Sequence, residues 1–258
     1  MNNILIKVEN LVKTFGGLVA LNDCSLEIKD KAITGIIGPN GSGKTTLFNV
    51  ITGNLKPDTG KVFYNGVEIT NEESHDLFHL GVLRTFQIAH EFSNMTVIEN
   101  LMVVPGNQKG ERLLYSLMNS QKIKKEDELI KDKAMEVLKF LKIEHLKNER
   151  AGNLSGGQKK LIELARTMMV DAKIVFLDEV GAGVNKTLLR DISDSILKLN
   201  QDKGYTFCMI EHDFNFISEL CDPVIVLAEG SVLFKGSAED VKSNEQVIES
   251  YLGTGLKK

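Results

Sequence analysis

The sequence predicts a mixed α/β fold: a core with a mainly parallel sheet, an N-terminal antiparallel β subdomain and a helical insertion. Three observations support this prediction. A short apolar run at 32–37 leads through a glycine-rich turn into a helical pattern that begins at Lys44. Alternating apolar residues at 4–9 and 24–29 indicate two N-terminal strands. Strand-like alternation stops between about 88 and 153 and then returns.

Turn signals divide the N-terminal part of the chain. Residues 13–17 form a turn after the first strand, and Asn65-Gly66 between two short apolar runs is a strong hairpin signal. A helix is predicted at 74–81. A strand follows at 82–86 and ends at Gln87.

Helical signals dominate residues 88–153. Thr96, with Glu99 three residues later, is a capping-box pattern that predicts a short helix. Apolar residues recur at helical spacing over 126–141, which indicates an amphipathic helix. A further apolar cluster at 113–118 is interpreted as packing within this insertion, in preference to binding a partner.

Helices and strands alternate again after the insertion. Ser155 suits the N-cap of a helix that runs to about Val170, and an apolar strand at 173–177 ends in Asp178-Glu179. The remaining predicted elements are helices at 186–199, 213–221 and 244–252, and strands at 205–210, 223–227 and 231–234.

Composition excludes several classes of protein. The net charge of −4 and the pI near 5.8 argue against a general nucleic-acid binder. No apolar run approaches the length of a membrane-spanning helix, and the N-terminus lacks the basic start and apolar run of a signal peptide. The widely separated Cys24, Cys208 and Cys221 are expected to be buried reduced thiols. We therefore expect a cytoplasmic location.

One glycine-rich stretch fits the phosphate-binding pattern G-x-x-x-x-G-K-[ST] at every fixed position. It reads Gly38-Pro39-Asn40-Gly41-Ser42-Gly43-Lys44-Thr45-Thr46. A strand, a glycine-rich turn and a helix N-terminus together place backbone N–H groups and a lysine around an anion. Such a loop binds the phosphates of a nucleotide, and Thr45 offers a hydroxyl to Mg²⁺.

Polar residues at predicted strand ends extend this site. Asp178 ends an apolar strand, where an acidic residue helps to hold Mg²⁺ in phosphate-loop enzymes. Glu179 beside it can polarise an attacking water. Gln87 ends its own strand; taken alone it would be an ordinary loop glutamine, and beside the other motifs it is a candidate to hydrogen-bond to the metal or the water. His212 follows a buried strand and can donate to a γ-phosphate oxygen. These residues predict nucleotide hydrolysis.

Two further features have more than one interpretation. Phe15 is either a core aromatic beside a turn, which the residues alone favour, or a ring that stacks on a nucleobase. The helix start Leu154-Ser155-Gly156-Gly157-Gln158 exposes its first N–H groups and can bind an anion.

These motifs, in this order and spacing, give a specific resemblance. The sequence resembles ATP-binding-cassette (ABC) ATPase subunits over essentially its whole length, through GPNGSGKTT, Gln87, LSGGQ at 154–158, IVFLDE at 174–179 and His212. More narrowly, it is similar to the ATPase subunits of branched-chain amino-acid importers. The residues that match are RTFQ at 84–87, MTVIENL at 95–101, GVN at 183–185 and VIESYLG at 247–253.

The resemblance implies a phosphate-loop NTPase (RecA-like) fold, with ATP and Mg²⁺ as cofactors. We expect one ABC ATPase domain over 1–258, in which 1–87 and 154–236 form the α/β nucleotide-binding core, 88–153 the helical insertion and 237–258 a C-terminal helical tail. It also implies roles for individual residues. Phe15 would stack on adenine, Gly38 to Thr46 would bind phosphate and Mg²⁺, and Gln87 would link the metal to a membrane partner. Ser155, Gly157 and Gln158 would contact ATP bound by a second subunit, Glu179 would be the catalytic base and His212 the switch histidine.

The implied function is the motor of an importer on the inner face of the cell membrane. Its implied partners are transmembrane permease subunits, a second ABC ATPase (identical or related) and, indirectly, a solute-binding protein. Two positions depart from the family's pattern. Val180 stands where proline is usual, which is expected to loosen the next loop and so to bear on rate or coupling. Asn185 stands where many members have aspartate, although the branched-chain subgroup often has asparagine. The alternatives are an ATPase for urea, amides or lipid export, or a non-transport ABC ATPase.

Overall fold

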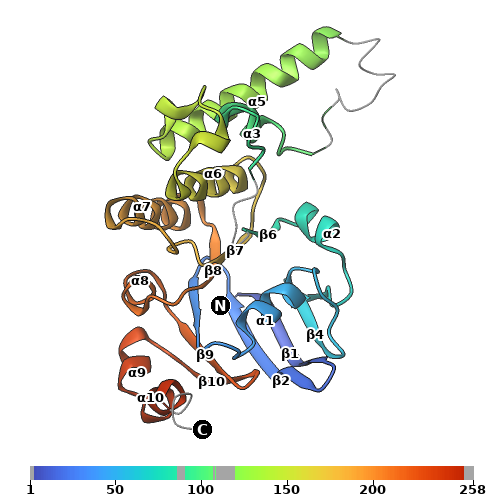
Figure 1. Cartoon of the computed structure of the whole chain (residues 1–258). Coiled ribbons are helices and arrows are strands. Elements are labelled where there is room, and N and C mark those ends of the chain that lie inside the picture. The colour runs from blue at the N-terminus through green and yellow to red at the C-terminus, as the bar shows by residue number, and fades with distance from the viewer. Residues whose placement is uncertain (1–2, 86–90, 107, 109–119, 253–258) are drawn as a thin grey trace. The chain divides into compact units, whose positions relative to one another are not determined.

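The computed structural model describes residues 3–85, 91–106, 108 and 120–252. The chain divides into two compact units. Figure 1 shows the helices and strands, with the colour running along the chain from blue at the N-terminus to red at the C-terminus. The first unit comprises Met1–Gln87, Lys173–Ala182 and Leu197–Lys258, and the second comprises Ile88–Ala172 and Gly183–Ile196. Gln87 and the apolar cluster at 113–118 lie outside the described residues. The assignment of 1–258 to one ATPase domain with a helical insertion stays a prediction.

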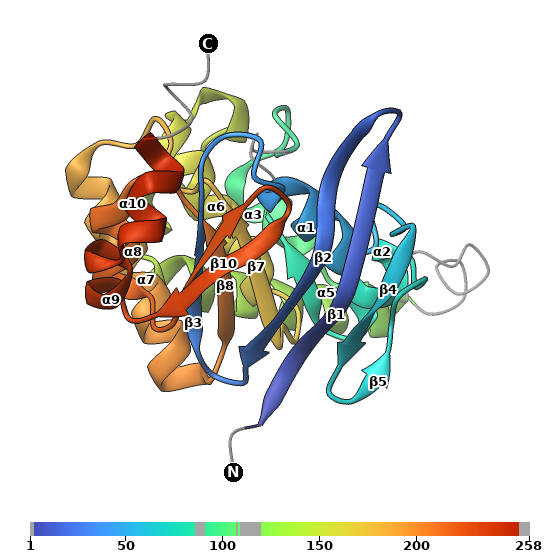
Figure 2. The same cartoon turned by 90° about the horizontal axis from the view of Figure 1, so that it is seen from below.

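The first unit contains an antiparallel sheet with strand order β2-β1-β4-β5. Strands β1 (Ile4–Phe15) and β2 (Leu18–Lys29) form a long hairpin that is prominent in Figure 2. These strands extend well beyond the predicted 4–9 and 24–29. Asn10 and Asp23 have φ values of +49° and +52°, and the strand register shifts beside Asn10. These irregularities interrupt the alternation of apolar and polar residues, so a prediction from that alternation underestimates the length of both strands.

The second hairpin of this sheet follows its turn signal. Strands β4 (Thr59–Tyr64) and β5 (Val67–Glu68) are joined by Asn65-Gly66. Both turn residues have positive φ, +48° and +80°, as a two-residue type I′ turn requires.

The other sheet of the first unit has six strands in the order β10-β9-β3-β8-β7-β6. All neighbouring pairs are parallel except β9 and β10. The strands are β3 (Ile33–Ile37), β6 (Val82–Arg84), β7 (Ile174–Asp178), β8 (Thr206–Ile210), β9 (Val224–Ala228) and β10 (Ser231–Gly236). The predicted α/β class, with an antiparallel N-terminal part and a mainly parallel sheet, is confirmed.

Complete burial explains the continuous apolar runs of the central strands. Every residue of β3, β7 and β8 is buried, as expected for parallel strands covered on both faces. Helix α1 (Lys44–Ile51) packs its apolar face into this core, and Phe48 meets Phe176 of β7 edge to face at 5.0 Å. Carboxyl ends of parallel strands lie along one edge of the sheet, so this core fixes the residues that follow β3, β7 and β8.

The described residues of the first unit also form α2 (Ser74–His79), α8 (Phe214–Leu220), α9 (Ala238–Ser243) and α10 (Glu245–Leu252). Helix α9 lies within the predicted helical tail 237–258, but it was not predicted as an element of its own. Its signal is a capping box, in which Ser237 accepts from the Asp240 N–H while the Asp240 side chain accepts from Ser237.

The described part of the second unit is helical. It contains α3 (Val97–Met102), α5 (Ser120–Phe140), α6 (Gly156–Met168), the short 3₁₀ helices Glu144–Leu146 and Ala151–Asn153, and the start of α7 (Lys186–Lys203). The predicted capping box of Thr96 and Glu99 is present. The buried Asn100 side chain accepts from the Phe92 N–H and donates to three backbone carbonyls, which fixes the segment before α3.

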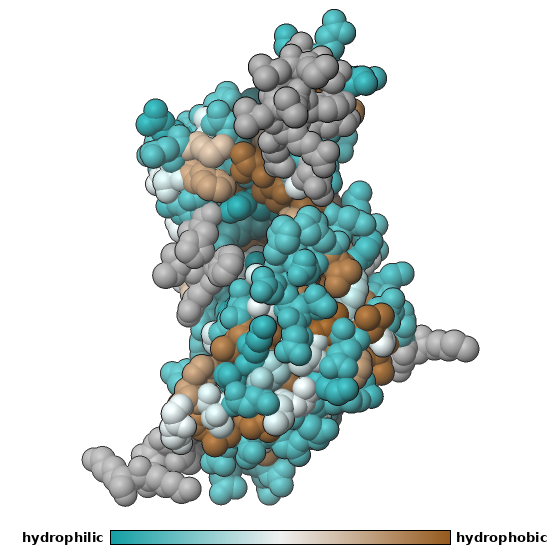
Figure 3. Space-filling model, turned by 90° about the vertical axis from the view of Figure 1, so that its right-hand side faces the viewer, coloured by the Kyte–Doolittle hydropathy of each residue, from teal (hydrophilic) through white to brown (hydrophobic). Residues whose placement is uncertain are grey.

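Two sequence expectations about the chain as a whole can be compared with the structure. Within the described residues, no helix has the length and apolarity needed to cross a membrane. On the face shown in Figure 3, hydrophilic and hydrophobic residues are interspersed.

Cys24, Cys208 and Cys221 are buried free thiols, as expected, and burial raises the pKa of Cys24 to about 12.

Candidate nucleotide site

The phosphate-loop motif connects β3 to the first turn of α1, as predicted. Two of its glycines are required by close backbone approach. A Cβ on Gly38 would lie 2.2 Å from the Leu227 carbonyl oxygen, and a Cβ on Gly43 would lie 2.4 Å from that of Ala20. Gly43 also has a φ of +99° and, as the N-cap of α1, provides no side-chain cap. The loop therefore leaves its helix N-terminus open toward a ligand.

Lys44 supplies a buried positive charge to this loop. Its side chain is 6% exposed, and Nζ donates to the carbonyl oxygens of Gly38 at 2.9 Å and Pro39 at 3.0 Å. Burial lowers the pKa of Lys44, and the nearby Glu179 and Asp178 partly offset this effect. An ammonium group beside an uncapped helix start and left-handed glycines is suited to a phosphate.

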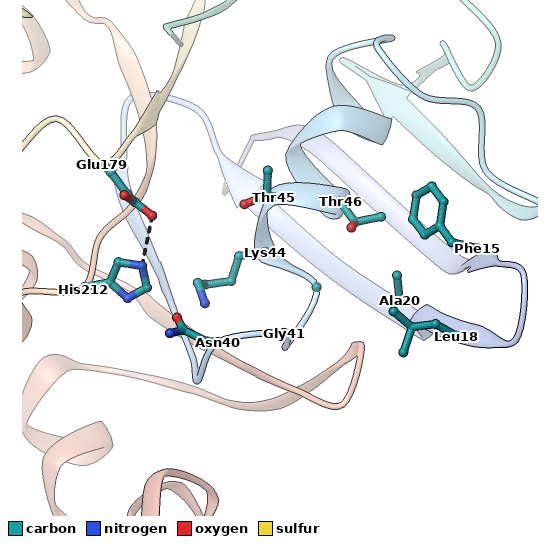
Figure 4. A pocket seen from close by; sticks show the side chains of 11 residues that line it. Phe15, Leu18, Ala20, Asn40, Gly41, Lys44, Thr45, Thr46, Glu179 and His212 are labelled. Carbon is teal, nitrogen blue, oxygen red and sulfur yellow. Dashed lines mark hydrogen bonds and ion pairs between the residues drawn. The ribbon is translucent and has the colours of Figure 1, made fainter. Parts of the chain in front are cut away.

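A pocket of about 270 Å³ opens beside the loop. Figure 4 shows Phe15 to one side of Lys44 and Thr45, and the pair Glu179–His212 to the other. The residues that line the pocket are Phe15, Leu18, Ala20, Asn40, Gly41, Gly43, Lys44, Thr45, Thr46, Glu179 and His212. The first unit thus gathers residues that are up to 197 positions apart in sequence, from Phe15 to His212 (212 − 15).

Phe15 lies at the end of β1 and is 48% exposed. Its preferred interpretation from the residues alone, a core aromatic, is therefore wrong. The two residues that precede Phe15 are held by Asp58, whose carboxylate accepts hydrogen bonds from the Lys13 ammonium at 2.8 Å and from the Thr14 N–H at 2.7 Å. Lys13 Nζ in turn lies 5.8 Å from the centre of the Phe15 ring. The ring is held in the pocket with an accessible face, as stacking on a base requires.

Glu179 and His212 follow the neighbouring parallel strands β7 and β8. Glu179 Oε1 lies 2.9 Å from His212 Nε2. When Glu179 is ionised its carboxylate can only accept, so the hydrogen bond then requires the His212 tautomer with a proton on Nε2. Glu179 has a φ of +51°, and its N–H donates to the Ile210 carbonyl. The Glu211 carboxylate accepts from the Gly181 N–H at 2.9 Å, so it supports the same turn.

Asp178 lies at the last position of β7 and is 1% exposed. Its Oδ2 accepts from Arg84 Nη2 at 2.7 Å, and Arg84 Nη1 donates to Asn49. Sequence reasoning used Arg84 only as part of a family resemblance and missed this contact. A charged residue inside a predicted buried strand was the signal that could have revealed it. Thr45 is exposed in the pocket, so oxygen donors suited to Mg²⁺ are present in this unit.

Tyr251 of α10 was also missed as a site neighbour. Burial raises the pKa of its hydroxyl, and a hydrogen bond with the Gly38 backbone partly offsets this effect. The C-terminal helix therefore contacts the base of the phosphate loop.

The LSGGQ stretch lies in the second unit and starts α6. Ser155 accepts from the Gln158 N–H, and the Gln158 side chain accepts from the Ser155 N–H at 2.9 Å. The predicted N-cap is confirmed. The two glycines differ, because a Cβ on Gly156 would meet nothing within 4 Å whereas a Cβ on Gly157 would lie 2.3 Å from Leu188. Only Gly156 keeps the helix start open.

The two departures from the family pattern have structural roles. Val180 is 5% exposed and packs in the first unit. Asn185 accepts from the Leu188 N–H at 3.0 Å and so caps the start of α7 in the second unit. Gln87 lies outside the described residues, and its predicted role stays a prediction.

Known proteins resemble this chain along nearly its full length. A protein of Archaeoglobus fulgidus, named "Probable branched-chain amino acid transport ATP-binding protein LivG", is 43% identical over 249 residues, which cover 96% of this chain and 95% of that protein. "High-affinity branched-chain amino acid transport ATP-binding protein BraF" of Pseudomonas aeruginosa is 34% identical over 98% of this chain and 99% of that protein. The crystal structure of an ATP-binding cassette of an ABC transporter in its ADP conformation superposes with a TM-score of 0.83, at 41% identity, over 97% of this chain and 99% of that one.

A family model agrees with these relatives. The model described as ABC transporter matches residues 21–182, which include the phosphate loop, LSGGQ and Glu179. The match spans more than half of the chain. This chain belongs to the ABC transporter family, as one of its ATP-binding cassettes.

Proposed function

We propose that this chain is the ATP-hydrolysing motor subunit of an ABC transporter that imports branched-chain amino acids across the cytoplasmic membrane. The observation that carries the proposal is the pocket of the first unit, which joins the phosphate loop to Phe15, Glu179 and His212. The choice of branched-chain amino acids as the solute rests on the relatives described above, which are named for branched-chain amino-acid transport.

ATP binds along the pocket in this proposal. The adenine stacks on Phe15, and the phosphates bind Lys44 and the backbone N–H groups at the start of α1. Thr45, Gln87 and Asp178 would hold Mg²⁺, which neutralises phosphate charge when it is bound. The other loop residues, Gly38 to Gly43 and Thr46, shape the cradle.

Hydrolysis uses the pair at the strand ends. Glu179 orients a water and takes up its proton as that water attacks the γ-phosphorus. The bond from the γ-phosphorus to the oxygen that bridges it to the β-phosphate breaks, so that ADP leaves and inorganic phosphate forms. His212 contacts the Glu179 carboxylate through Nε2 in the structure. In the proposed mechanism, His212 would donate to a γ-phosphate oxygen once ATP is bound. A positioned carboxylate of this kind contributes about 10²- to 10⁴-fold to a rate.

A second ATPase subunit completes the site. The phosphate loop leaves the γ-phosphate facing outward, and the N-terminus of α6 in another cassette, with Ser155, Gly156, Gly157 and Gln158, provides the N–H groups that close around it. ATP then stabilises a closed dimer and hydrolysis weakens it. Shifting such an equilibrium fully needs about 5 kcal/mol of differential binding, which a charged ligand held by two subunits can supply. The partner is either an identical or a related ATPase.

The remaining partners are membrane proteins. The helical insertion transmits closure to transmembrane permease subunits, which receive the solute from a solute-binding protein. The chain is accordingly placed at the cytoplasmic face of the cell membrane as a peripheral subunit, with no nucleic-acid partner. These assignments rest on the family and on the relatives.

Reconstitution tests the proposal. The chain is purified with the permease subunits that copurify with it and placed in ATP-loaded vesicles together with the solute-binding protein. Uptake of labelled leucine, isoleucine or valine is expected, and the same complex carrying Glu179→Gln is the matched control. Uptake of urea or an amide instead, lipid export, or copurification with ribosomes or DNA would overturn the assignment.

A further inference from the structure

We propose that Arg84 is a positioning residue that fixes the Asp178 carboxylate for the metal of the nucleotide site, and that it needs Asn49 to do so. The inference rests on the proposed ATPase function. It concerns three residues of the first unit that lie on β6, β7 and α1.

The contact between Arg84 and Asp178 is short and buried. Nη2 lies 2.7 Å from Oδ2, and the two side chains are 9% and 2% exposed. At this burial, solvent screens the pair weakly, and a charge-assisted hydrogen bond is strongly directional. One oxygen of the carboxylate is therefore held in place, which determines where the other oxygen, Oδ1, can lie.

Two more contacts fix the guanidinium itself. Nη1 donates to Asn49 Oδ1 on α1, the helix that begins at the phosphate loop. The guanidinium carbon lies 5.9 Å from the centre of the Phe48 ring, which packs against Phe176 of β7. Arg84 Nε has no hydrogen-bond partner among the residues that the structure describes, so Asp178 and Asn49 set the orientation of the fork.

This arrangement couples the two ends of the metal site. Thr45 lies on α1, and Asp178 ends β7. Arg84 bridges these elements through Asn49 and Asp178. Mg²⁺ requires its oxygen ligands, direct or through water, in a near-ideal octahedron. A bridge between the two elements is a means of keeping that geometry.

Arginine is suited to this role and lysine is not. The planar guanidinium donates to two acceptors at once in a fixed geometry, whereas an ammonium on a flexible stem is a point charge. Lysine at position 84 would keep the charge beside Asp178 and lose the second attachment. Methionine would fill similar space with no donor.

Nucleotide titrations with and without Mg²⁺ test the proposal, with the full-length chain as wild type, Arg84→Lys and Arg84→Met. The quantity compared is the gain in ATP affinity on adding Mg²⁺. We expect Arg84→Met to keep Mg²⁺-free ATP affinity within about twofold and to lose at least tenfold of the Mg²⁺ gain, with Arg84→Lys intermediate. Arg190→Met, an exposed arginine on α7, is the matched control and is expected to keep the gain.

The outcomes separate the possibilities. An unchanged Mg²⁺ gain in folded Arg84→Met overturns the proposal, and so does a larger gain, because Arg84 would then compete with the cation. If Arg84→Met does not fold, Asn49→Ala decides: the ion pair stays, and about a threefold smaller Mg²⁺ gain is expected, whereas an unchanged gain overturns the role. Failure of the wild-type chain to bind ATP at all would contradict the proposed function instead.

Discussion

The side chains of Glu179 and His212 form a hydrogen-bonded pair, with 2.9 Å between Oε1 and Nε2, at the ends of neighbouring parallel strands. The carboxylate is 18% exposed and the imidazole 50% exposed, so the pair lies at the boundary between the core and the pocket. The rigid, fully buried strands β7 and β8 fix its geometry. If Glu179 is the base, as proposed, a carboxylate held this way needs little rearrangement to act on a water in the pocket.

Glu179→Gln should retain ATP binding and lose hydrolysis. An amide cannot take up a proton, so we expect the steady-state rate to fall at least about a hundredfold. ATP affinity should change little, since Phe15 and the phosphate loop are intact. Size-exclusion chromatography with ATP should show a trapped dimer. An unchanged steady-state rate would show that Glu179 is not the base.

Phe15→Ala should weaken the binding of ATP and leave that of triphosphate unchanged. The ring is about half exposed in the pocket, and base stacking contributes about 0.5–1.5 kcal/mol, which corresponds to a roughly 2- to 13-fold change in Kd. Calorimetric titration measures this change, and Phe15→Tyr, which keeps the ring, is the control. Equal losses of ATP and triphosphate affinity would mean that the substitution disturbs the loop and not a stacking contact.

Local chemistry explains which parts of the fold could be predicted from the sequence. Buried parallel strands such as β3 and β7 appear in the sequence as continuous apolar runs. The pair Asn65-Gly66 predicts its turn because these residue types readily adopt the positive φ values that the turn requires. The full length of β1 could not be predicted, because Asn10 adopts positive φ in a strand whose register shifts there. Tertiary pairing with β2 and β4 determines the strand where local pattern fails.

The same limit applies to the site. The phosphate loop, Ser155 and Glu179 have local signatures and were predicted. Arg84 has only a weak one, a charge inside a predicted buried strand, and this signal does not identify its partner, because Asp178 lies 94 positions away. Phe15 was misjudged from the residues alone because exposure of an aromatic depends on what packs around it, and short-range pattern does not report this.

Gly156→Ala should separate binding from hydrolysis. A Cβ there meets no atom within 4 Å, so folding should be unaffected, yet it covers the N–H groups at the start of α6. We expect normal ATP binding by the isolated chain with loss of ATP-dependent dimerisation and of hydrolysis. Gly43→Ala is the contrasting variant, because its Cβ would lie 2.4 Å from the Ala20 carbonyl oxygen, and it should lose ATP binding itself. Normal hydrolysis by Gly156→Ala would remove the α6 N-terminus from the site.

Asp58→Asn should reduce stability in a pH-dependent way and loosen Phe15. Hydrogen bonds from Lys13 and then Thr14 lower the pKa of Asp58 from 3.8 to about 2. Because the folded-state pKa is depressed, the stabilisation is present above about pH 4 and disappears as the pH falls from about 4 to 2.

Urea unfolding of wild type and variant measures this effect. The free energies of unfolding should therefore differ by a constant amount from pH 7 to 5, and the difference should shrink by pH 3. Asp202→Asn, at an exposed position of α7, is the control. At pH 7 the variant should also bind ATP more weakly, since Asp58 holds the residues that precede Phe15. A stability difference that persists unchanged to pH 3 would mean that the amide disturbs the turn by shape, and that the charge of Asp58 is not what stabilises it.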